Sequence, residues 1–338
     1  MARRGGWRRE GSRRRFRYVD SHGNRIDDPD RLERVEALRI PPAWREVWIS
    51  PNPGAKLQAT GVDSAGRRQY LYHPKFRAAQ EHAKFEKLIR FGERLPTLRE
   101  AMAEHMEAER LEPERVSAVA VRLVNLSWFR IGSDRYATVS RTYGITTLRK
   151  RHVSVRGRRI TFSFPGKGRA QVRRTLADEE LAEEIRYLRG LDGGSRLFRY
   201  RLNGGLCNLT GPRLNEYIGL HLGEDFTAKD FRTWGGTLLA AIGLAEHGPA
   251  ETEAEAKRTL AAVMRSVADK LGNTPAVSRA SYVSPAVVEQ YLDGRTLEDF
   301  RPRHLRVLGA RDIGLDREER SLLSLMRSWR IRRSRLAA

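Results

Sequence analysis

The sequence predicts an α+β fold in which a small antiparallel β-sheet domain precedes a larger, mostly helical domain. Two short alternating stretches within residues 57–72 flank a turn, as in a β-hairpin. Residues 152–175 alternate through three more strands, which predicts a three-stranded β-meander inside the helical domain. Most of the other sequence after residue 96 repeats its apolar side chains at helical spacing. These patterns separate an N-terminal sheet from a helical body.

The 338 residues are enough for two domains, and we expect the boundary at Gly92–Pro96, which interrupts a helical pattern. Four parts are predicted: a basic flexible arm (1–16), an N-terminal β-sheet domain (17–95), a mostly helical domain (96–330) and a basic flexible tail (331–338). Both ends are rich in arginine, and blocks of like charge usually stay disordered.

The N-terminal domain is expected to contain a strand with turns over residues 17–29, a helix over 30–38, a strand at 47–49 and the hairpin. In the second arm of the hairpin, alternation places Arg68, Tyr70 and Tyr72 on one face and Gln69 on the other. A face with two tyrosines and a guanidinium fits a DNA backbone or groove. It equally fits a solvated sheet face with aromatic pairs, and the alternation leaves both interpretations open.

Helices are expected at residues 76–91, 97–111, 113–131, 177–191, 212–222, 228–248, 251–271 and 285–291, with more basic helix beyond 301. Thr227 and Asp230 predict a capping box at the start of one of them. The helix that begins at Pro113 has a strongly apolar face, which is expected to be buried and consists of Val116, Val119, Ala120, Leu123, Val124 and Leu126.

Three basic side chains stand at unusual positions. Arg130 ends the buried helix beside Trp128 and Phe129, where a guanidinium is either salt-bridged or held out for an anion. Arg232 lies in the first turns of its helix and opposes the helix dipole, which is tolerated if an anion binds there. Lys167 lies at the tip of a β-turn between glycines, either as a solvated lysine or as a mobile ammonium group that serves a neighbouring cleft as a point charge or proton donor.

The stretch from Leu271 to Pro285 begins at the end of the long helix expected at residues 251–271. Gly272 is expected to end that helix, and Asn273–Pro275 to form a turn. Ser284 then caps the next helix, so Tyr282 is expected on a short bridge between the two. Such a tyrosine is either a packing anchor or, if cations that stabilise a phosphate lie nearby, a nucleophile.

Composition narrows the choice of function. Lys and Arg number 64 against 42 Asp and Glu, which gives a formal net charge of +22. Such an excess favours a nucleic-acid partner, and a generally basic protein is the alternative. The single cysteine, Cys207, excludes an internal disulfide, and the eight histidines lack metal-ligand spacing. The sequence contains no nucleotide-binding loop, so we expect no cofactor, and the histidine spacing gives no reason to expect a metal. It also contains no signal peptide and no membrane span, so we expect a cytoplasmic protein.

Seven motifs, in this order, resemble the type IB DNA topoisomerases of the poxvirus and bacterial kind: IPPAWREVWISP, LQATGVDSAGRRQYLYHP, WFRIGSDRYA, YGITTLRKRHV, FPGKG, EDFTAKDFRTWGGT and LGNTPAVSRASYVSP. The resemblance covers nearly all of residues 17–295. It implies an ATP- and metal-independent isomerase that relaxes positive and negative supercoils through a 3′-phosphotyrosyl intermediate, strand rotation and religation.

The resemblance also implies roles for single residues. Tyr282 would be the nucleophile, Arg130 and Arg232 would brace the non-bridging oxygens, and Lys167 would protonate the 5′-oxygen leaving group. Asn273 stands where the poxvirus members have histidine, and it would donate a hydrogen bond to the phosphate. An amide does not titrate, so an acid–base role is excluded at this position.

In the family the two domains close as a clamp around double-stranded DNA, and the protein is expected to act as a monomer in the cytoplasm, associated with the nucleoid. The residues expected to contact DNA are Arg67, Arg68, Gln69, Tyr70, Tyr72, Arg135, Tyr136 and Lys229. Two alternatives stay open. A tyrosine recombinase shares the catalytic order but typically has histidine where Lys229 stands, and a DNA-binding clamp without catalysis would lack a catalytic side chain.

Overall fold

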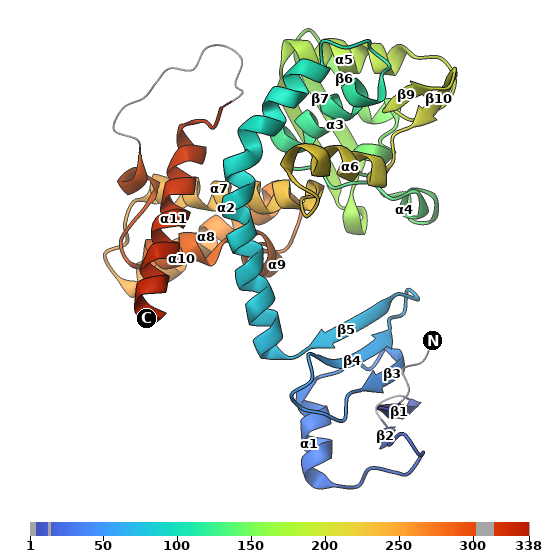
Figure 1. Ribbon diagram of the computed structural model, residues 1–338, viewed down its shortest axis with the longest axis vertical. Coiled ribbons are helices and arrows are strands. Elements are labelled where there is room, and N and C mark those ends of the chain that lie inside the picture. Colours follow the sequence, from blue (N-terminus) through green and yellow to red (C-terminus); the bar gives the residue numbers. More distant parts are fainter. Residues whose placement is uncertain (1–4, 13–14, 302–313, 338) are drawn as a thin grey trace. The chain divides into compact units, whose positions relative to one another are not determined.

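The computed structural model describes residues 5–12, 15–301 and 314–337. The chain forms two compact units, Met1–Lys84 and Phe85–Ala338, and the division falls within helix α2 (Pro74–His105) (Figure 1). The predicted α+β fold, with an N-terminal antiparallel sheet, a mostly helical body and a three-stranded meander, is confirmed. The predicted boundary at Gly92–Pro96 is wrong, because helix α2 runs through these residues without a break and the two units divide between Lys84 and Phe85.

The first unit is built on an antiparallel sheet, whose described strands follow the order β2-β1-β3-β4-β5. Its elements are β1 (Trp7–Ser12), β2 (Arg15–Val19), α1 (Pro29–Ala37), β3 (Arg45–Ile49), β4 (Leu57–Val62) and β5 (Arg68–Tyr72). The predicted hairpin and helix are therefore present. The prediction of a flexible arm at residues 1–16 is wrong for the described residues of that range. There, β1 lies between β2 and β3, and Trp7 is buried in the core of the unit.

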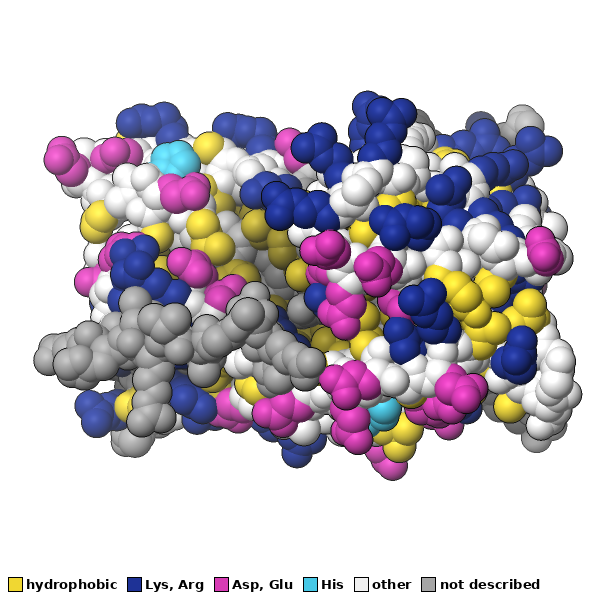
Figure 2. Space-filling model, turned by 90° about the horizontal axis from the view of Figure 1, so that it is seen from above, with side chains coloured by type: hydrophobic (Ala, Val, Ile, Leu, Met, Phe, Trp, Pro, Cys, Tyr) yellow, Lys and Arg dark blue, Asp and Glu magenta, His cyan; other side chains and the backbone are white. Residues whose placement is uncertain are grey.

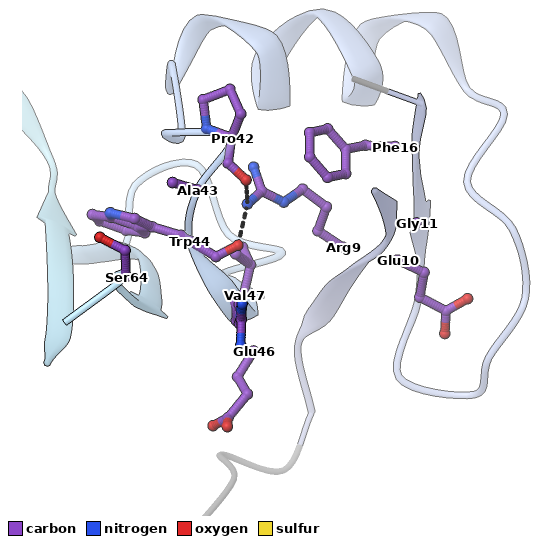
Figure 3. A pocket seen from close by; sticks show the side chains of 11 residues that line it. Arg9, Glu10, Gly11, Phe16, Pro42, Ala43, Trp44, Glu46, Val47 and Ser64 are labelled. Atoms are coloured by element: carbon purple, nitrogen blue, oxygen red, sulfur yellow. Dashed lines mark hydrogen bonds between the residues drawn. The ribbon is translucent and has the colours of Figure 1, made fainter. Parts of the chain in front are cut away.

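Arg9 explains why an arginine-rich stretch joins the sheet. Its guanidinium donates hydrogen bonds to the carbonyl oxygens of Pro42 (3.4 Å) and Trp44 (2.7 Å), and it packs 4.1 Å from the ring centroid of Phe16 (Figure 3). These residues line a cavity of about 530 Å³. Burial lowers the pKa of Arg9, opposed by the nearby Tyr18. The side chain thus holds the segment between α1 and β3 against β1.

Helix α2 runs without interruption through Pro96, although two helices were expected here. A proline inside a helix costs about 3 kcal/mol because it removes one hydrogen bond and crowds the preceding turn. Here Phe91, Leu95 and Leu98 are fully buried around it. Burial of a large apolar side chain contributes about 1.5–3 kcal/mol. The packing of three such side chains therefore outweighs the cost of the proline.

The second unit carries the remaining elements. They are α3 (Pro113–Ser127), α4 (Asp134–Val139), β6 (Val153–Arg156), β7 (Arg159–Pro165), β8 (Gln171–Ala177), α5 (Glu179–Gly190), β9 (Arg199–Leu202), β10 (Gly205–Asn208), α6 (Gly211–Leu222), α7 (Ala228–His247), α8 (Glu253–Leu271), α9 (Pro275–Tyr282), α10 (Pro285–Leu292) and α11 (Arg317–Ala337). The meander follows the order β6-β7-β8. Helix α4 and the β9–β10 hairpin were not predicted.

Two further expectations for this unit are wrong. Leu126 was expected in the buried face of α3, but it is 41% exposed. The flexible tail predicted for residues 331–338 is helical through Ala337, because α11 buries Leu322, Leu325 and Trp329 in the core. The helix expected just beyond residue 301 falls largely on residues 302–313, which lie outside the described residues.

The surface carries both signs of charge. In the space-filling view of Figure 2, Lys and Arg side chains gather toward the upper edge, and Asp and Glu side chains gather toward the lower edge. The positive excess is therefore uneven on this face. In the described part of the chain, no helix combines the length and the apolar character needed to cross a lipid bilayer.

Candidate active site

Tyr282 is the last residue of α9 and is 9% exposed. The turn expected at Asn273–Pro275 is present at Asn273 and Thr274, but Pro275 already begins this helix, and Thr274 caps it by accepting a hydrogen bond from the amide of Val277. Proline suits the first helical position, where no amide hydrogen is needed. Tyr282 therefore does not lie on an irregular bridge. The main chain of α9 fixes its position.

Helix α7 packs against the backbone of Tyr282 and binds it through a hydrogen bond. The hydroxyl of Thr237 donates a hydrogen bond to the carbonyl oxygen of Tyr282 (3.2 Å) and accepts one from the amide of Ser284 (3.1 Å). One residue earlier, Gly236 faces the same carbonyl, and a Cβ there would lie 2.7 Å from that oxygen. The close approach of α7 and α9 thus depends on a glycine and on a buried hydroxyl.

Arg232 and Arg130 flank the tyrosine. Arg232 on α7 is 5% exposed, and its guanidinium carbon lies 5.1 Å from the ring centroid of Tyr282. It donates hydrogen bonds to the carbonyl oxygens of Trp128 (2.5 Å) and Leu271 (2.7 Å). Trp128 ends α3 in the left-handed region (φ 54°), so α3 stops short of the predicted residue 131 and releases Arg130 into a loop. A non-glycine residue in this region is strained, and such strain is common at functional sites.

Asn273 is joined to this group. One nitrogen of Arg130 donates to the side-chain oxygen of Asn273 (2.5 Å) and to the carbonyl oxygen of Gly272 (3.1 Å). Because the oxygen of the amide accepts from Arg130, its nitrogen remains as a donor. The structure therefore brings together four of the five predicted catalytic residues.

Two donors in this group are buried without a hydrogen-bond partner among the described residues: Nε of Arg232 and Nδ2 of Asn273. A buried donor left unpaired costs about 1–3 kcal/mol. Hydrogen bonds hold the other polar atoms of both side chains in place. The two unpaired donor atoms therefore have fixed positions. An anion with several oxygens, such as a phosphodiester, is the kind of group that would satisfy both.

The charges in the group shift the pKa of Tyr282. Burial raises the pKa of this phenol, but the charge and hydrogen bond of Arg232, with smaller effects of Arg130, outweigh burial and lower the pKa below the ordinary value of 10.0. Burial lowers the pKa of Arg232 to about 10, helped by repulsion from Arg130 and opposed by Tyr282. The site therefore stabilises the phenolate form of Tyr282 more strongly than bulk water would.

Lys167 lies in the turn between β7 and β8. Gly168 follows it in the left-handed region (φ 69°), which allows the tight turn. The side chain of Lys167 is exposed and makes no hydrogen bond or ion pair with any other described residue. It lines a cavity of about 70 Å³ together with Arg130 and Arg232, so the fifth predicted catalytic residue borders the same cavity as two of the other four.

Arg174 on β8 lines the same cavity and was not predicted. The sequence carried one signal for it. Along β8 the side chains of Val172 and Leu176 pack against the core, and alternation assigns the position between them to the same inward face. A charged residue at an inward position is unusual and indicates a specific partner.

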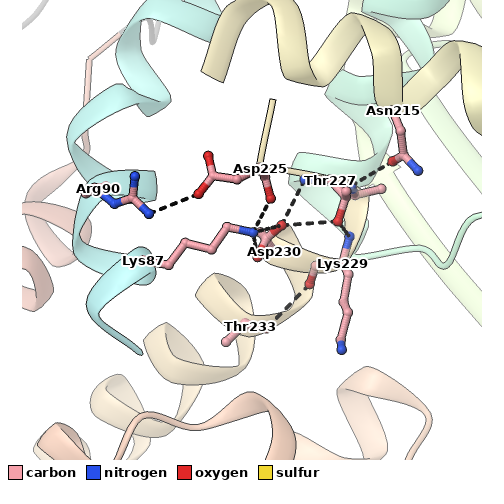
Figure 4. A network of polar contacts seen from close by, with 9 residues as sticks. Lys87, Arg90, Asn215, Asp225, Thr227, Lys229, Asp230 and Thr233 are labelled. Atoms are coloured by element: carbon pink, nitrogen blue, oxygen red, sulfur yellow. Dashed lines mark hydrogen bonds and ion pairs between the residues drawn. The ribbon is translucent and has the colours of Figure 1, made fainter. Parts of the chain in front are cut away.

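A polar network fixes the first turn of α7 (Figure 4). The predicted capping box is confirmed, because Asp230 accepts from the amide of Thr227 (2.8 Å). Asp230 also pairs with Lys87 of α2 at 3.0 Å, and Asn215 of α6 accepts from the amide of Ala228 (3.1 Å). The side chain of Lys229 points away from this network and is exposed. The helix that carries Arg232 is thus tied to two others at its start.

The residues predicted to contact DNA are found in both units. In the first unit, Tyr70 and Tyr72 are 49% and 40% exposed on β5, and their rings stack with centroids 6.2 Å apart. The carboxylate of Asp63 accepts hydrogen bonds from the side chains of Arg67 and Gln69, both at 2.8 Å. The hydrogen bond from the backbone amide of Arg67, followed by these side-chain bonds and the bond from the amide of Ala65, lowers the pKa of Asp63 to about 2.

The other predicted DNA contacts are exposed side chains. Arg68 lies on the same face as the two tyrosines, with a long ion pair to Glu46 (3.6 Å). In the second unit, Arg135 and Tyr136 are exposed on α4, and Tyr136 is 45% exposed. Exposed basic and aromatic side chains are the types that bind phosphates and nucleotides.

Comparison with known proteins gives two family matches and several relatives. Residues 73–297 match the eukaryotic DNA topoisomerase I catalytic core, and residues 15–63 match the bacterial DNA topoisomerase IB N-terminal domain. The chain is 33% identical over 291 residues to DNA topoisomerase 1B of Acanthamoeba polyphaga mimivirus, which covers 84% of this chain and 86% of that protein.

Poxvirus proteins are more distant. The chain is 21% identical over 283 residues to DNA topoisomerase I of Monkeypox virus and to DNA topoisomerase 1B of Vaccinia virus (strain Copenhagen), with 80% of this chain and 85% of each relative covered. The first family match spans well over half of the sequence and includes every residue of the group around Tyr282. The chain therefore belongs to the type IB DNA topoisomerase family.

Proposed function

We propose that Tyr282 is the nucleophile with which this topoisomerase cleaves one strand of duplex DNA. Its phenolic oxygen forms a bond to phosphorus, the bond from phosphorus to the 5′-oxygen breaks, and the chain is left joined to a 3′-phosphate. The lowered pKa of Tyr282 supports this role, because a phenolate attacks far better than a phenol. The same bonds change in reverse during religation, after the free strand has rotated and supercoils of either sign have relaxed.

Arg130, Arg232 and Asn273 stabilise the charge that builds on the non-bridging oxygens. The vacant donors on Arg232 and Asn273 support this assignment, since they are fixed in place before a substrate arrives. Removal of one such donor from a site for a developing negative charge costs about 10²–10³ in rate. Asn273 has no titratable proton, so it acts only as a donor.

Lys167 donates the proton that the departing 5′-oxygen requires. Its exposed ammonium group lines the same cavity as Arg130 and Arg232 and has no competing partner among the described residues. No nucleotide, metal or other cofactor enters these steps. The observation that carries the proposal is the convergence of the buried guanidinium of Arg232 and the partly buried guanidinium of Arg130 on the buried Tyr282.

We propose further that the DNA backbone and grooves are contacted by Arg67, Arg68, Gln69, Tyr70, Tyr72, Arg135, Tyr136 and Lys229. The exposure of all of them except the partly buried Gln69, and the charge of the arginines and Lys229, support this assignment. We also propose that the protein acts as a monomer in the cytoplasm, bound to the nucleoid. The net charge of +22 supports binding to DNA there.

Relaxation of positively and negatively supercoiled plasmid, in EDTA and without ATP, tests the function. The intact protein should relax both and form a covalent 3′-DNA adduct, whereas Tyr282→Phe should do neither while it still binds DNA. Ser281→Ala, which alters the neighbouring hydroxyl, is the matched control and should retain activity. Relaxation by Tyr282→Phe would show that the nucleophile is another residue.

A further inference from the structure

Arg174 is an anomaly in an otherwise regular strand. Exposed and partly buried residues alternate along β8, and Arg174 occupies an inward position between the apolar Val172 and Leu176. Burial lowers the pKa of Arg174. A charge in such a place is unfavourable unless polar groups bind it. The hydrogen bonds of the Arg174 guanidinium therefore indicate its role.

The guanidinium of Arg174 links two segments that are far apart in the sequence. One nitrogen donates a hydrogen bond to the carbonyl oxygen of Lys270, in the last turn of α8, and another donates to the carbonyl oxygen of Arg173 (2.9 Å). Lys270 is three residues before Asn273. No carboxylate of the described residues forms an ion pair with Arg174, so neutral carbonyl groups are its partners there.

The β7–β8 hairpin carries Lys167 at its tip and is held on both sides. On the β7 side, the amide of Tyr143 donates to the carbonyl oxygen of Pro165 (2.8 Å). On the β8 side, the bond from Arg174 to Lys270 connects the hairpin to the segment that leads to Asn273. Lys167 itself has no partner among the described residues, so these anchors set where its ammonium group lies.

We propose that Arg174 is a positioning residue that keeps Lys167 within reach of the 5′-oxygen. The inference rests on the proposed role of Lys167 as the proton donor. Without the guanidinium, the hairpin loses its anchor on the β8 side, and the ammonium group spends less time near the leaving oxygen. Misplacement of a catalytic group by about 1 Å can lower a rate by about 10²-fold. We expect a loss of about tenfold, since the anchor at Pro165 remains.

The test uses a leaving group that needs no proton. In a duplex whose scissile bond has sulfur in place of the bridging 5′-oxygen, the product is a thiolate. Because a thiol has a pKa of about 8.5, far below that of an alcohol, the thiolate departs without a proton donor. Arg174→Met retains an apolar stem on the inward face and removes the guanidinium. Arg173→Met removes the same charge from the exposed neighbour on the other face of β8, and so controls for the loss of attraction to DNA.

Single-turnover cleavage of both duplexes at saturating enzyme should separate the possible roles. Arg174→Met should cleave the oxygen duplex about tenfold more slowly than the wild type and the sulfur duplex within about twofold of it, while Arg173→Met matches the wild type on both. Equal slowing on both duplexes would mean that Arg174 acts on the phosphate or the fold, and wild-type rates on both would mean that it has no role. Either result overturns the inference.

Lys167→Ala, measured in parallel, separates this inference from the function on which it rests. Its defect on the oxygen duplex should disappear on the sulfur duplex. If sulfur rescues Lys167→Ala but not Arg174→Met, only the positioning role fails. If sulfur does not rescue Lys167→Ala, the assignment of the proton donor fails, and the inference fails with it.

Discussion

Gly236→Ala should move Tyr282, the proposed nucleophile, without touching the DNA. The added Cβ would lie 2.7 Å from the carbonyl oxygen of Tyr282 and 3.0 Å from its Cβ. Carbon and oxygen atoms in proteins approach to about 3.3 Å in their closest favourable contacts. The backbone of Tyr282 must therefore shift by roughly 0.6 Å, because a main-chain oxygen has no other way to yield.

The size of the effect follows from this shift. If a displacement of 1 Å costs about 10²-fold in rate, one of 0.6 Å should slow single-turnover cleavage on the order of tenfold. Overpacking costs about 1–3 kcal/mol, and alanine gains about 1 kcal/mol over glycine inside a helix. The free energy of unfolding should therefore fall by up to about 2 kcal/mol, while DNA affinity stays the same.

Gly243→Ala is the matched control on the same helix. Its Cβ would lie 3.3 Å from a side-chain atom of Val263, which can give way by a few tenths of an ångström. This variant should cleave at the wild-type rate and be equally stable or slightly more stable. If Gly236→Ala also cleaves at the wild-type rate, the close packing of α7 against α9 does not position Tyr282, and the reasoning is refuted.

Three more predictions concern charges. Glu319→Gln breaks a buried ion pair with Arg99 (2.8 Å) and should lower the free energy of unfolding by about 3 kcal/mol in urea titration; an unchanged midpoint would contradict this. Arg130→Ala removes an interaction that lowers the pKa of Tyr282, so the rise of cleavage rate with pH should move to higher pH, and a stationary profile would count against it. Burial and two neighbouring arginines lower the pKa of His152 to about 4, so the unfolded chain alone binds this proton between about pH 6.5 and 4. Stability should fall as the pH drops through that window, and this part of the fall should be absent in His152→Gln.

The sequence predicted the elements whose local signals agree with their packing. The hairpin of β4 and β5 follows from alternation around a Gly-containing turn, and α7 follows from its capping box. The strand β1 was missed because its arginines suggested disorder, whereas Arg9 binds carbonyl groups supplied by residues 40–44. Local sequence does not indicate partners that lie so far along the chain.

The sequence named the residues that the structure brings together around Tyr282, but it did not predict their geometry. Asn273 lies on irregular backbone as expected, but Tyr282 was also expected there and lies in a helix, since Asn-Thr-Pro signals a turn as readily as it signals the start of a helix. Arg174 was missed because nothing in the sequence reveals that the inward face of β8 borders the cavity. The contact between Arg130 and Asn273 spans 143 residues, and only the folded chain brings them together.

The partners of Arg232 have a consequence for how the site binds an anion. Trp128 and Leu271 are at the C-terminal ends of α3 and α8, so Arg232 is held by the negative ends of two helix dipoles. A carboxylate in their place would hold the guanidinium equally well, but it would cancel a full unit of charge and compete with the phosphate. Fractional dipole charges fix the side chain and leave most of its positive potential directed at the substrate. The positive potential that an anion would meet is therefore already in place before DNA binds.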